Sequence, residues 1–120
     1  MAKVTIVQWS DKVLNQLLDE DIRAIKIELL NGVIENTPVK TGRLKGNWQT
    51  TTGSPNISTT ERLDPNGTAA MNEVRNTVTP DGIDFMTNNL PYAAAQEERR
   101  GMVAMTVARI QQVVRGFSDR

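Results

Sequence analysis

A long apolar stripe between residues 13 and 34 is the feature that most limits how this chain can fold. Its members recur at spacings of three and four, which is the period of an amphipathic α-helix with one buried face. Ser10 stands at the N-cap position and Asp11 lies in the first turn, so a helix is predicted from there to about Glu35. Gly32 interrupts the stripe, and we expect another backbone to approach the helix closely at that point. The apolar positions are Val13, Leu14, Leu17, Leu18, Ile22, Ile25, Leu29, Leu30, Val33 and Ile34.

Three short segments have the β-branched and aromatic content that is typical of strands. They are Lys3–Trp9, Leu44–Thr52 and Ile83–Asn88, and the third follows a Pro-Asp-Gly turn. The segment between the second and third strands begins with residues 53–67, which are rich in turn-forming residues and predict an exposed, flexible loop. The sequence therefore places strands on both sides of the long helix.

Two further helices are predicted after that loop. Residues 68–76 fit a short helix or a strand, and we favour the helix, with Ala69, Met71 and Val74 as its weak apolar anchors. A last helix is predicted to begin at Gly101 and to end near Gly116. Its apolar residues repeat every three or four positions, namely Val103, Val107, Ile110 and Val114, and Met102 and Met105 are expected to fill the core at its start.

The predicted order is β-α-β-α-β-α. It gives an α+β fold, in which a long N-terminal helix and a C-terminal helix pack on a small, mostly antiparallel sheet. With 120 residues the chain is long enough for a single domain, residues 1–120, with one modest core. The start of the chain lacks the apolar length of a signal sequence, and no later stretch is long enough for a membrane span. We therefore expect the protein to be made in a reducing cytosol, without membrane association.

Composition removes several functional classes. The chain has neither Cys nor His, which excludes disulfides, thiolate nucleophiles, cysteine or histidine zinc sites and imidazole catalysis. Lys plus Arg equals Asp plus Glu at 14 each, so no strong field predicts nucleic acid as the main partner. We expect no cofactor, no metal and no enzymatic activity.

Two acidic stretches contain residue types that can bind metal ions. The residues of Asp19–Asp21 spread around the helix and Asp19 is four residues before Arg23, which favours a solvated face with one stabilising pair. Asp64–Thr68 begins like a calcium loop, but the later ligands are missing. A turn and a helix cap are the better interpretation there.

The segment Asn36–Trp48, "NTPVKTGRLKGNW", is the strongest candidate for function, and we call it the corner. Pro38 ends the long helix, Thr37 and Thr41 have hydroxyls for nearby backbone groups, and Gly42 can adopt a positive φ. A rigid turn of this kind projects Lys40, Arg43 and Lys45, with Trp48 as the anchor of the next strand. The corner is either a purely structural turn or a contact surface. In a contact surface, Arg43 would be the best candidate to pair with a carboxylate of a neighbouring molecule, and the family resemblance given below favours this interpretation.

A second charged segment, Glu97–Arg100, places two anions beside two cations in an exposed connector. Its three preceding alanines permit a helical turn. It is either a solvated surface or a latch that forms ion pairs with an adjacent subunit. Exposed ion pairs of this kind would determine how the two subunits align more than how tightly they bind.

Two motifs resemble those of one protein family. "TPVKTGRLKGNWQ" and, some forty residues later, "NNLPYA" followed by Glu97, with "GMVAMTVARIQQ" after them, resemble the tail-completion, or head-to-tail joining, proteins of tailed bacteriophages. The resemblance covers about residues 14–114, and the two motifs together are fairly specific. This chain departs from the family pattern at Lys40, where the family often has an acidic residue, and in a shorter link, without the usual glycine, between Glu97 and Gly101. The matching positions are Thr37, Pro38, Val39, Thr41, Gly42, Arg43 and Trp48, then Asn88, Asn89, Pro91, Tyr92, Ala93 and Glu97, then Gly101, Met102 and Val103.

The resemblance implies a structural protein of the virion, made in the host cytoplasm. It would form a homo-oligomeric ring of six copies at the neck, between the connector and the tail tube, and DNA would pass through its bore without sequence-specific binding. The expected interface residues are Thr37, Pro38, Lys40, Thr41, Arg43, Lys45, Tyr92, Glu97, Glu98, Arg99 and Arg100.

Three alternatives remain open at this stage. The chain could serve as a tail terminator instead. It could be a small nucleic-acid-binding module that uses Lys40, Arg43, Lys45 and Trp48. The least favoured alternative is a hydrolase that uses Asp84 or Glu97.

Overall fold

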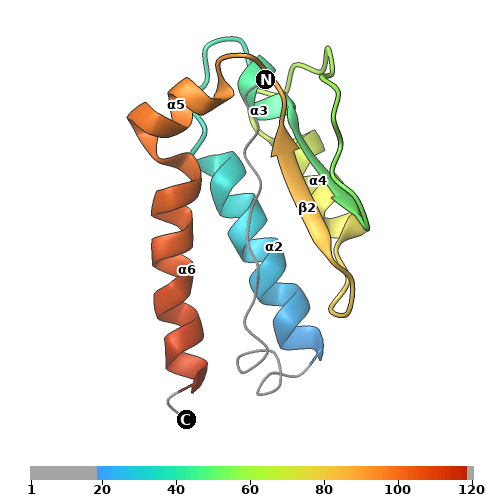
Figure 1. The fold of residues 1–120 in the computed structure, drawn as a ribbon, viewed down its shortest axis with the longest axis vertical. Coiled ribbons are helices and arrows are strands. Elements are labelled where there is room, and N and C mark those ends of the chain that lie inside the picture. Colours follow the sequence, from blue (N-terminus) through green and yellow to red (C-terminus); the bar gives the residue numbers. More distant parts are fainter. Residues whose placement is uncertain (1–18, 119–120) are drawn as a thin grey trace.

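The computed structural model describes residues 19–118, and their side chains as far as residue 115 (Figure 1). The fold is α+β, as predicted, with helices and a two-stranded antiparallel sheet in the described residues. The elements are α2 (Asp19–Glu35), α3 (Arg43–Gly46), β1 (Trp48–Thr52), α4 (Thr68–Thr77), β2 (Asp84–Asn88), α5 (Ala93–Arg100) and α6 (Met102–Ser118). The predicted strand Lys3–Trp9 and the first turns of the predicted long helix lie outside the described residues.

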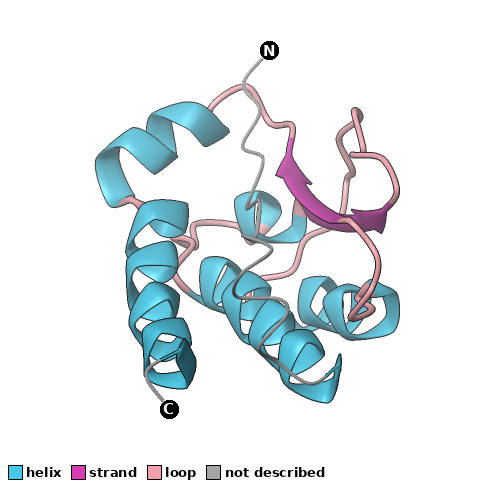
Figure 2. Cartoon of the chain, turned by 60° about the horizontal axis from the view of Figure 1, so that its bottom comes forward, coloured by secondary structure: helices cyan, strands magenta, loops and turns pink. Residues whose placement is uncertain are grey.

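Helix α2 is the centre of the structure. The described part of its apolar stripe, from Ile22 to Ile34, is buried, and the helix packs against α6 on one side and α4 on the other. Helix α2 lies between α6 and α4 (Figure 2), and α4 packs against β1. The main core therefore lies between α2 and the elements around it, and its residues include Leu29, Val33, Ile34, Trp48 and Met86.

The glycine within the stripe of α2 marks a close approach, but the neighbour differs from the prediction. A Cβ at Gly32 would lie 2.6 Å from Nη2 of Arg109 and 2.7 Å from Cγ2 of Thr106. Both neighbours are side chains of α6 and not a backbone. Gly32 therefore makes room for the α2–α6 packing, and an alanine there would push on the neighbouring helix.

The second predicted strand starts later in the structure, at Trp48 and not at Leu44. Residues Arg43–Gly46 form the short helix α3, and β1 starts only at Trp48. Gly42 has a left-handed backbone with φ of 86°, and its carbonyl oxygen accepts a hydrogen bond from Gly46 N at 2.9 Å. This local turn coils the backbone, so Leu44 to Gly46 cannot extend as a strand.

The two strands pair antiparallel, and their register runs from Trp48 opposite Asn88 to Thr52 opposite Asp84. This confirms the third predicted strand, apart from Ile83, which lies just before it and is exposed. Trp48 and Met86 are fully buried in the core.

Residues 68–77 form helix α4, which confirms the favoured interpretation of this segment. The carboxylate of Asp64 accepts hydrogen bonds from the amides of Ala69 and Ala70, at 3.2 and 2.9 Å, so Asp64 caps this helix as predicted. The predicted anchors are partly wrong. Ala70 and Val74 are buried, whereas Ala69 is exposed and Met71 is only half-buried.

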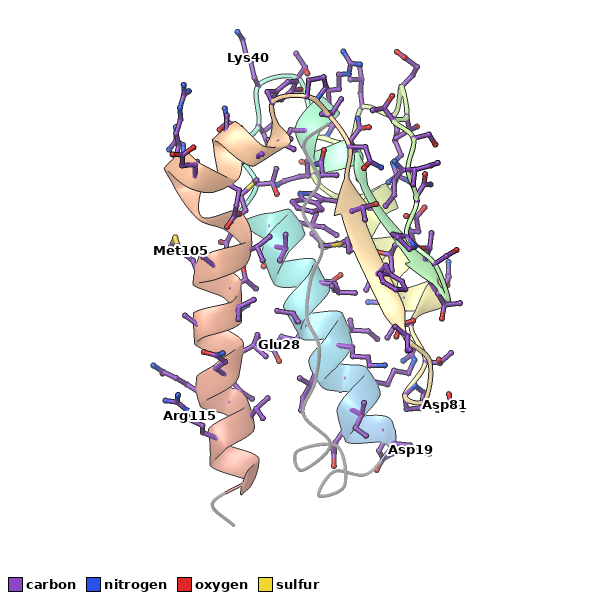
Figure 3. All side chains as sticks on the ribbon, viewed as in Figure 1. Asp19, Glu28, Lys40, Asp81, Met105 and Arg115 are labelled. Carbon is purple, nitrogen blue, oxygen red and sulfur yellow. The ribbon has the colours of Figure 1, made fainter. Side chains whose placement is uncertain are left out.

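The C-terminal part contains more helix than predicted. The connector forms the eight-residue helix α5, which ends at Gly101 with a left-handed φ of 62°, and α6 follows directly. Met102 fills the core as predicted, but Met105 is 62% exposed, because it faces away from α2 (Figure 3). Among the described residues, no helix combines the length and the apolar character that crossing a membrane requires.

Candidate functional site

The corner is held from inside by a chain of hydrogen bonds. The hydroxyl of Thr37 donates to the carbonyl oxygen of Val33 in the last turns of α2, at 2.7 Å. The same hydroxyl accepts a hydrogen bond from Nε1 of Trp48, also at 2.7 Å. Thr37 and Trp48 are both buried, so each polar atom finds its partner inside the protein. This chain of bonds fixes the end of α2 to the start of β1.

Gly42 locks the other side of the corner. Its carbonyl oxygen also accepts a hydrogen bond from Asp64 N at 3.0 Å, which connects the corner to the end of the loop after β1. A Cβ at Gly42 would lie 2.5 Å from the nitrogen of Pro65 and 2.7 Å from its Cδ. Both the positive φ and the lack of space require glycine at this position.

The outward part of the corner is exposed. Val39, Lys40, Thr41 and Arg43 all face solvent, and Pro38 is half-buried. Lys40 lies at the end of the molecule that holds α3 and α5, and its side chain extends outward from it (Figure 3). Within residues 19–115, the side chains of Lys40 and Arg43 make no hydrogen bond or ion pair. The corner therefore presents two uncompensated cations on a fixed backbone.

Lys45 does not join them, and its predicted projection from the corner is wrong. This residue is only 8% exposed, and its Cδ lies close to Gly67, near the start of α4. In a strand, Arg43 and Lys45 would share a face. In the helical turn α3 they lie about 200° apart, so Arg43 points outward and Lys45 points inward.

The second motif meets the corner through Asn88. Its side-chain amide donates to the carbonyl oxygen of Leu44 in α3 at 2.8 Å, and its Oδ1 accepts a hydrogen bond from Leu90 N at 3.3 Å. These bonds fix the path from β2 toward Tyr92 beside the corner. Tyr92 is 42% exposed and available for contact. The two motifs therefore belong to one end of the molecule, as Figure 1 shows for α3 and α5.

Within the predicted latch, Glu97–Arg100, the first residue caps a helix and the other three are exposed. The carboxylate of Glu97 accepts hydrogen bonds from the amides of Val103 at 2.7 Å and Ala104 at 3.1 Å, so it caps the first turn of α6. Glu97 is thus engaged within its own chain, and its assignment to a subunit contact needs this correction. Glu98, Arg99 and Arg100 are exposed in the last turn of α5. The two arginines favour the negative end of that helix.

Polar contacts fix the long loop after β1, and sequence reasoning missed them. The side-chain amide of Asn47 donates to the carbonyl oxygen of Thr60, and its oxygen accepts from Thr60 N. Asn89 donates to the carbonyl oxygens of Asn56 and Ser58, at 2.9 and 3.0 Å. The density of asparagine in and around the loop was the available signal, because an amide side chain can bond two backbone groups at once.

The carboxylate of Asp84 is engaged in a buried ion pair. The ammonium group of Lys26 lies 3.0 Å from Asp84 Oδ2 and also donates to the carbonyl oxygens of Thr79 and Gly82, at 2.8 and 2.9 Å. Both members are almost fully buried. Asp84 and Glu97, the two carboxylates of the hydrolase alternative, therefore both hold the fold together in this structure.

The other acidic positions carry no site in the described residues. Arg23, which was predicted to pair with Asp19, donates instead to the carbonyl oxygens of Arg75 and Val78 at the end of α4. No group of three or more acidic side chains within residues 19–115 gathers closely enough to hold a metal ion. A groove of about 550 Å³ runs over α2 between α4 and α6, and its charges are mixed, including Glu28, Arg75 and Arg109.

Comparison with known proteins adds no family assignment: no protein-family model, no curated protein and no solved structure matches the chain. The fixed, cation-bearing corner and its neighbour α5 are the features on which a functional proposal can be built.

Proposed function

We propose that this chain is a structural subunit of the neck of a tailed bacteriophage, of the tail-completion or head-to-tail joining class. Six copies form a ring between the connector and the tail tube, and the genome passes through the bore. The corner, with Tyr92 and the exposed end of α5, is the surface that binds a neighbouring copy or another virion protein. The resemblance of the two sequence motifs to this family is what directs the proposal to the virion.

One observation carries the contact role of the corner. Its backbone is held from inside by Thr37, Gly42 and Trp48, while Lys40 and Arg43 stay exposed and have no partner in the described part of the chain. A turn that only connected two elements would not need cations at these positions. A guanidinium on a fixed backbone loses less freedom when it pairs with a carboxylate, so a prearranged Arg43 favours binding.

The charge balance agrees with a conduit for DNA. The chain has 14 cationic and 14 anionic side chains and no net charge. A strongly cationic bore would bind phosphates and hold the passing DNA, since each neutralised phosphate releases counterions and strengthens binding. A neutral ring avoids this retention.

The proposal is tested by assembly. The purified chain is examined by mass photometry and negative-stain electron microscopy, alone and with purified connector and tail tube. We expect a closed ring, or ring formation in the presence of one of these partners. The partner that triggers assembly also separates tail completion from tail termination. A chain that remains monomeric under all these conditions contradicts the proposal.

The contact surface is tested with a charge reversal and a matched control. The double variant Lys40→Glu/Arg43→Glu is expected to lose ring formation and head-to-tail joining. Arg115→Glu changes an exposed arginine on α6, far from the corner (Figure 3), and is expected to assemble normally. Equal loss of assembly in both variants would point to a general charge effect.

The burial of two predicted contact residues weakens the nucleic-acid alternative. Of its four predicted contact residues, Lys45 and Trp48 are buried, which leaves Lys40 and Arg43 without an aromatic platform. A salt titration of DNA binding separates the two ideas. A neck subunit binds no DNA at physiological salt, whereas several phosphate contacts would give a steep dependence on salt concentration.

A further inference from the structure

The end of the loop after β1 lies directly against the corner. The amide of Asp64 donates to the carbonyl oxygen of Gly42 at 3.0 Å, and a Cβ at Gly42 would lie 2.5 Å from the nitrogen of Pro65. Leu63 comes just before this contact and Arg43 just after Gly42. Given the covalent geometry of the chain, this one hydrogen bond keeps the Cα atoms of Leu63 and Arg43 within about 8 Å of each other. The two residues are therefore neighbours in space.

The backbone on both sides of Leu63 is fixed by long-range bonds. Before it, Nε of Arg62 donates to the carbonyl oxygen of Gly46 at 2.8 Å, and Nη2 donates to that of Trp48 at 2.9 Å. After it, Asp64 is buried and caps α4. Leu63 itself is nevertheless 63% exposed. A binding partner would therefore meet an aliphatic group whose position is already set, which lowers the entropy lost on binding.

Exposed apolar side chains gather at this end of the protein. Seven large apolar residues are exposed among those that the structure describes, and three of them, Val39, Leu63 and Tyr92, lie in or beside the corner. A single exposed apolar residue needs no explanation, but several of them together, with polar residues around them, are typical of a contact surface. Lys40 and Arg43 are exposed at the same place. The surface thus combines apolar area with positive charge.

We propose that Leu63 belongs to the contact surface of the corner, and that this surface binds a protein segment with a carboxylate beside an apolar pocket. The carboxylate pairs with the guanidinium of Arg43, and the pocket takes the side chain of Leu63. The spacing of Leu63 and Arg43 sets the spacing of the two groups on the partner. This inference rests on the proposed function and adds to it a residue and a partner chemistry that the sequence motifs do not indicate.

The two residues contribute differently to binding. The guanidinium of Arg43 orients the partner, because charge complementarity acts mainly on encounter and alignment. Burial of the Leu63 side chain supplies affinity, since removal of apolar area from water is the dominant favourable term in most protein association. Raising the salt concentration should therefore weaken the contribution of Arg43 and leave that of Leu63 almost unchanged.

The proposal is tested in the assembly experiment, alone and with purified connector and tail tube, with two matched variants. Leu63→Ala and Ile57→Ala each shorten an exposed aliphatic side chain of the same loop. Ile57 lies over the sheet, because its neighbour Asn56 bonds to Gln49 and Thr87. Leu63→Ala should raise the concentration required for half-maximal assembly at least about tenfold, and Ile57→Ala less than about twofold. Both melting temperatures should stay within about 3 °C of the wild-type value.

A double-mutant cycle tests whether Leu63 and Arg43 meet the same segment. If they do, Leu63→Ala/Arg43→Ala should weaken assembly less than the product of the two single effects. Leu63→Met keeps most of the apolar volume and should assemble like the wild type. Independent effects, or normal assembly of Leu63→Ala, would overturn this inference while ring formation still supports the neck function. A wild-type chain that never assembles would overturn both.

A second measurement identifies the partner segment. The chain contains no Cys, so Leu63→Cys can carry a photoreactive benzophenone at one known position. Illumination of the assembly should cross-link this position to a segment that contains Asp or Glu together with apolar residues, which mass spectrometry identifies. The same label on Ile57→Cys should give no cross-link to that segment. Cross-links from position 63 that are no stronger than those from position 57, or that reach only segments without a carboxylate, would contradict the proposal.

Discussion

The inner and outer halves of the corner each contain a threonine and a lysine, but their environments are opposite. The inner half, Thr37, Gly42, Lys45 and Trp48, is buried and held by the core. The outer half, Val39, Lys40, Thr41 and Arg43, is exposed. Stability depends on the first group, and binding to other molecules can depend on the second. Substitutions in the two halves should therefore separate folding from assembly.

The largest expected effect comes from the anchor of the corner. Trp48→Ala removes a fully buried indole and the donor to Thr37, and we expect it to lower the free energy of unfolding by about 3–5 kcal/mol. Urea denaturation followed by circular dichroism measures this. Trp48→Phe keeps most of the packing and should cost clearly less. A loss below about 1 kcal/mol for the alanine variant would show that the corner is not anchored there.

A buried cation outside the corner should be nearly as sensitive. Lys26→Met leaves the carboxylate of Asp84 buried without its partner, and a loss of about 3–5 kcal/mol is expected. The double variant Lys26→Met/Asp84→Asn removes both charges and should recover part of this loss. If the double variant is less stable than the single one, the ion pair is not the cause.

Gly42 sharpens the comparison because the chain offers a matched control. Gly42 and Gly53 have nearly the same φ, 86° and 87°, but only Gly42 lies against other atoms, whereas a Cβ at Gly53 would meet nothing within 4 Å. Both alanine variants should lose about 1–2 kcal/mol from the left-handed backbone. Gly42→Ala should lose more, from its contact with Pro65. Equal melting temperatures for the two variants would mean that the corner can shift to make room.

Two adjacent glutamates should behave differently. Glu97→Ala removes the cap of α6 and is expected to cost about 1 kcal/mol. Glu98→Ala removes an exposed side chain and should change stability by less than about 0.5 kcal/mol. Thermal unfolding of both variants checks the difference. Equal effects would argue against the capping role of Glu97.

Much of the fold could be predicted from the sequence, because long periodic patterns are strong signals. The stripe of α2, the spacing of α6 and the alternation around β2 each correspond to an element in the structure. The described part of α2 and both ends of β2 agree with the prediction within a residue or two. The helix α4 was favoured on weaker grounds and is confirmed.

The site was harder to predict, since it depends on local turns and long-range bonds. Leu44–Gly46 was predicted as the start of a strand but belongs to the helix α3, and Lys45, which was predicted to project from a rigid turn beside Arg43, is buried. Glu97 looked like a free charge because nothing in the sequence shows that its carboxylate reaches the amides of the next helix. Charge spacing therefore identified the region but not which charges are available.

The smallest expected effect on stability is also the sharpest test of the corner. Arg43→Ala removes an exposed side chain without a partner in the described residues, so the free energy of unfolding should change by less than about 0.5 kcal/mol. Head-to-tail joining should nevertheless fall, because the guanidinium is the expected partner of a neighbour's carboxylate. Arg43→Lys keeps the charge but not the planar fork, and should restore only part of the activity. Normal joining by Arg43→Ala would remove this residue from the contact, while a stability loss equal to that of Trp48→Ala would remove the distinction between the two halves.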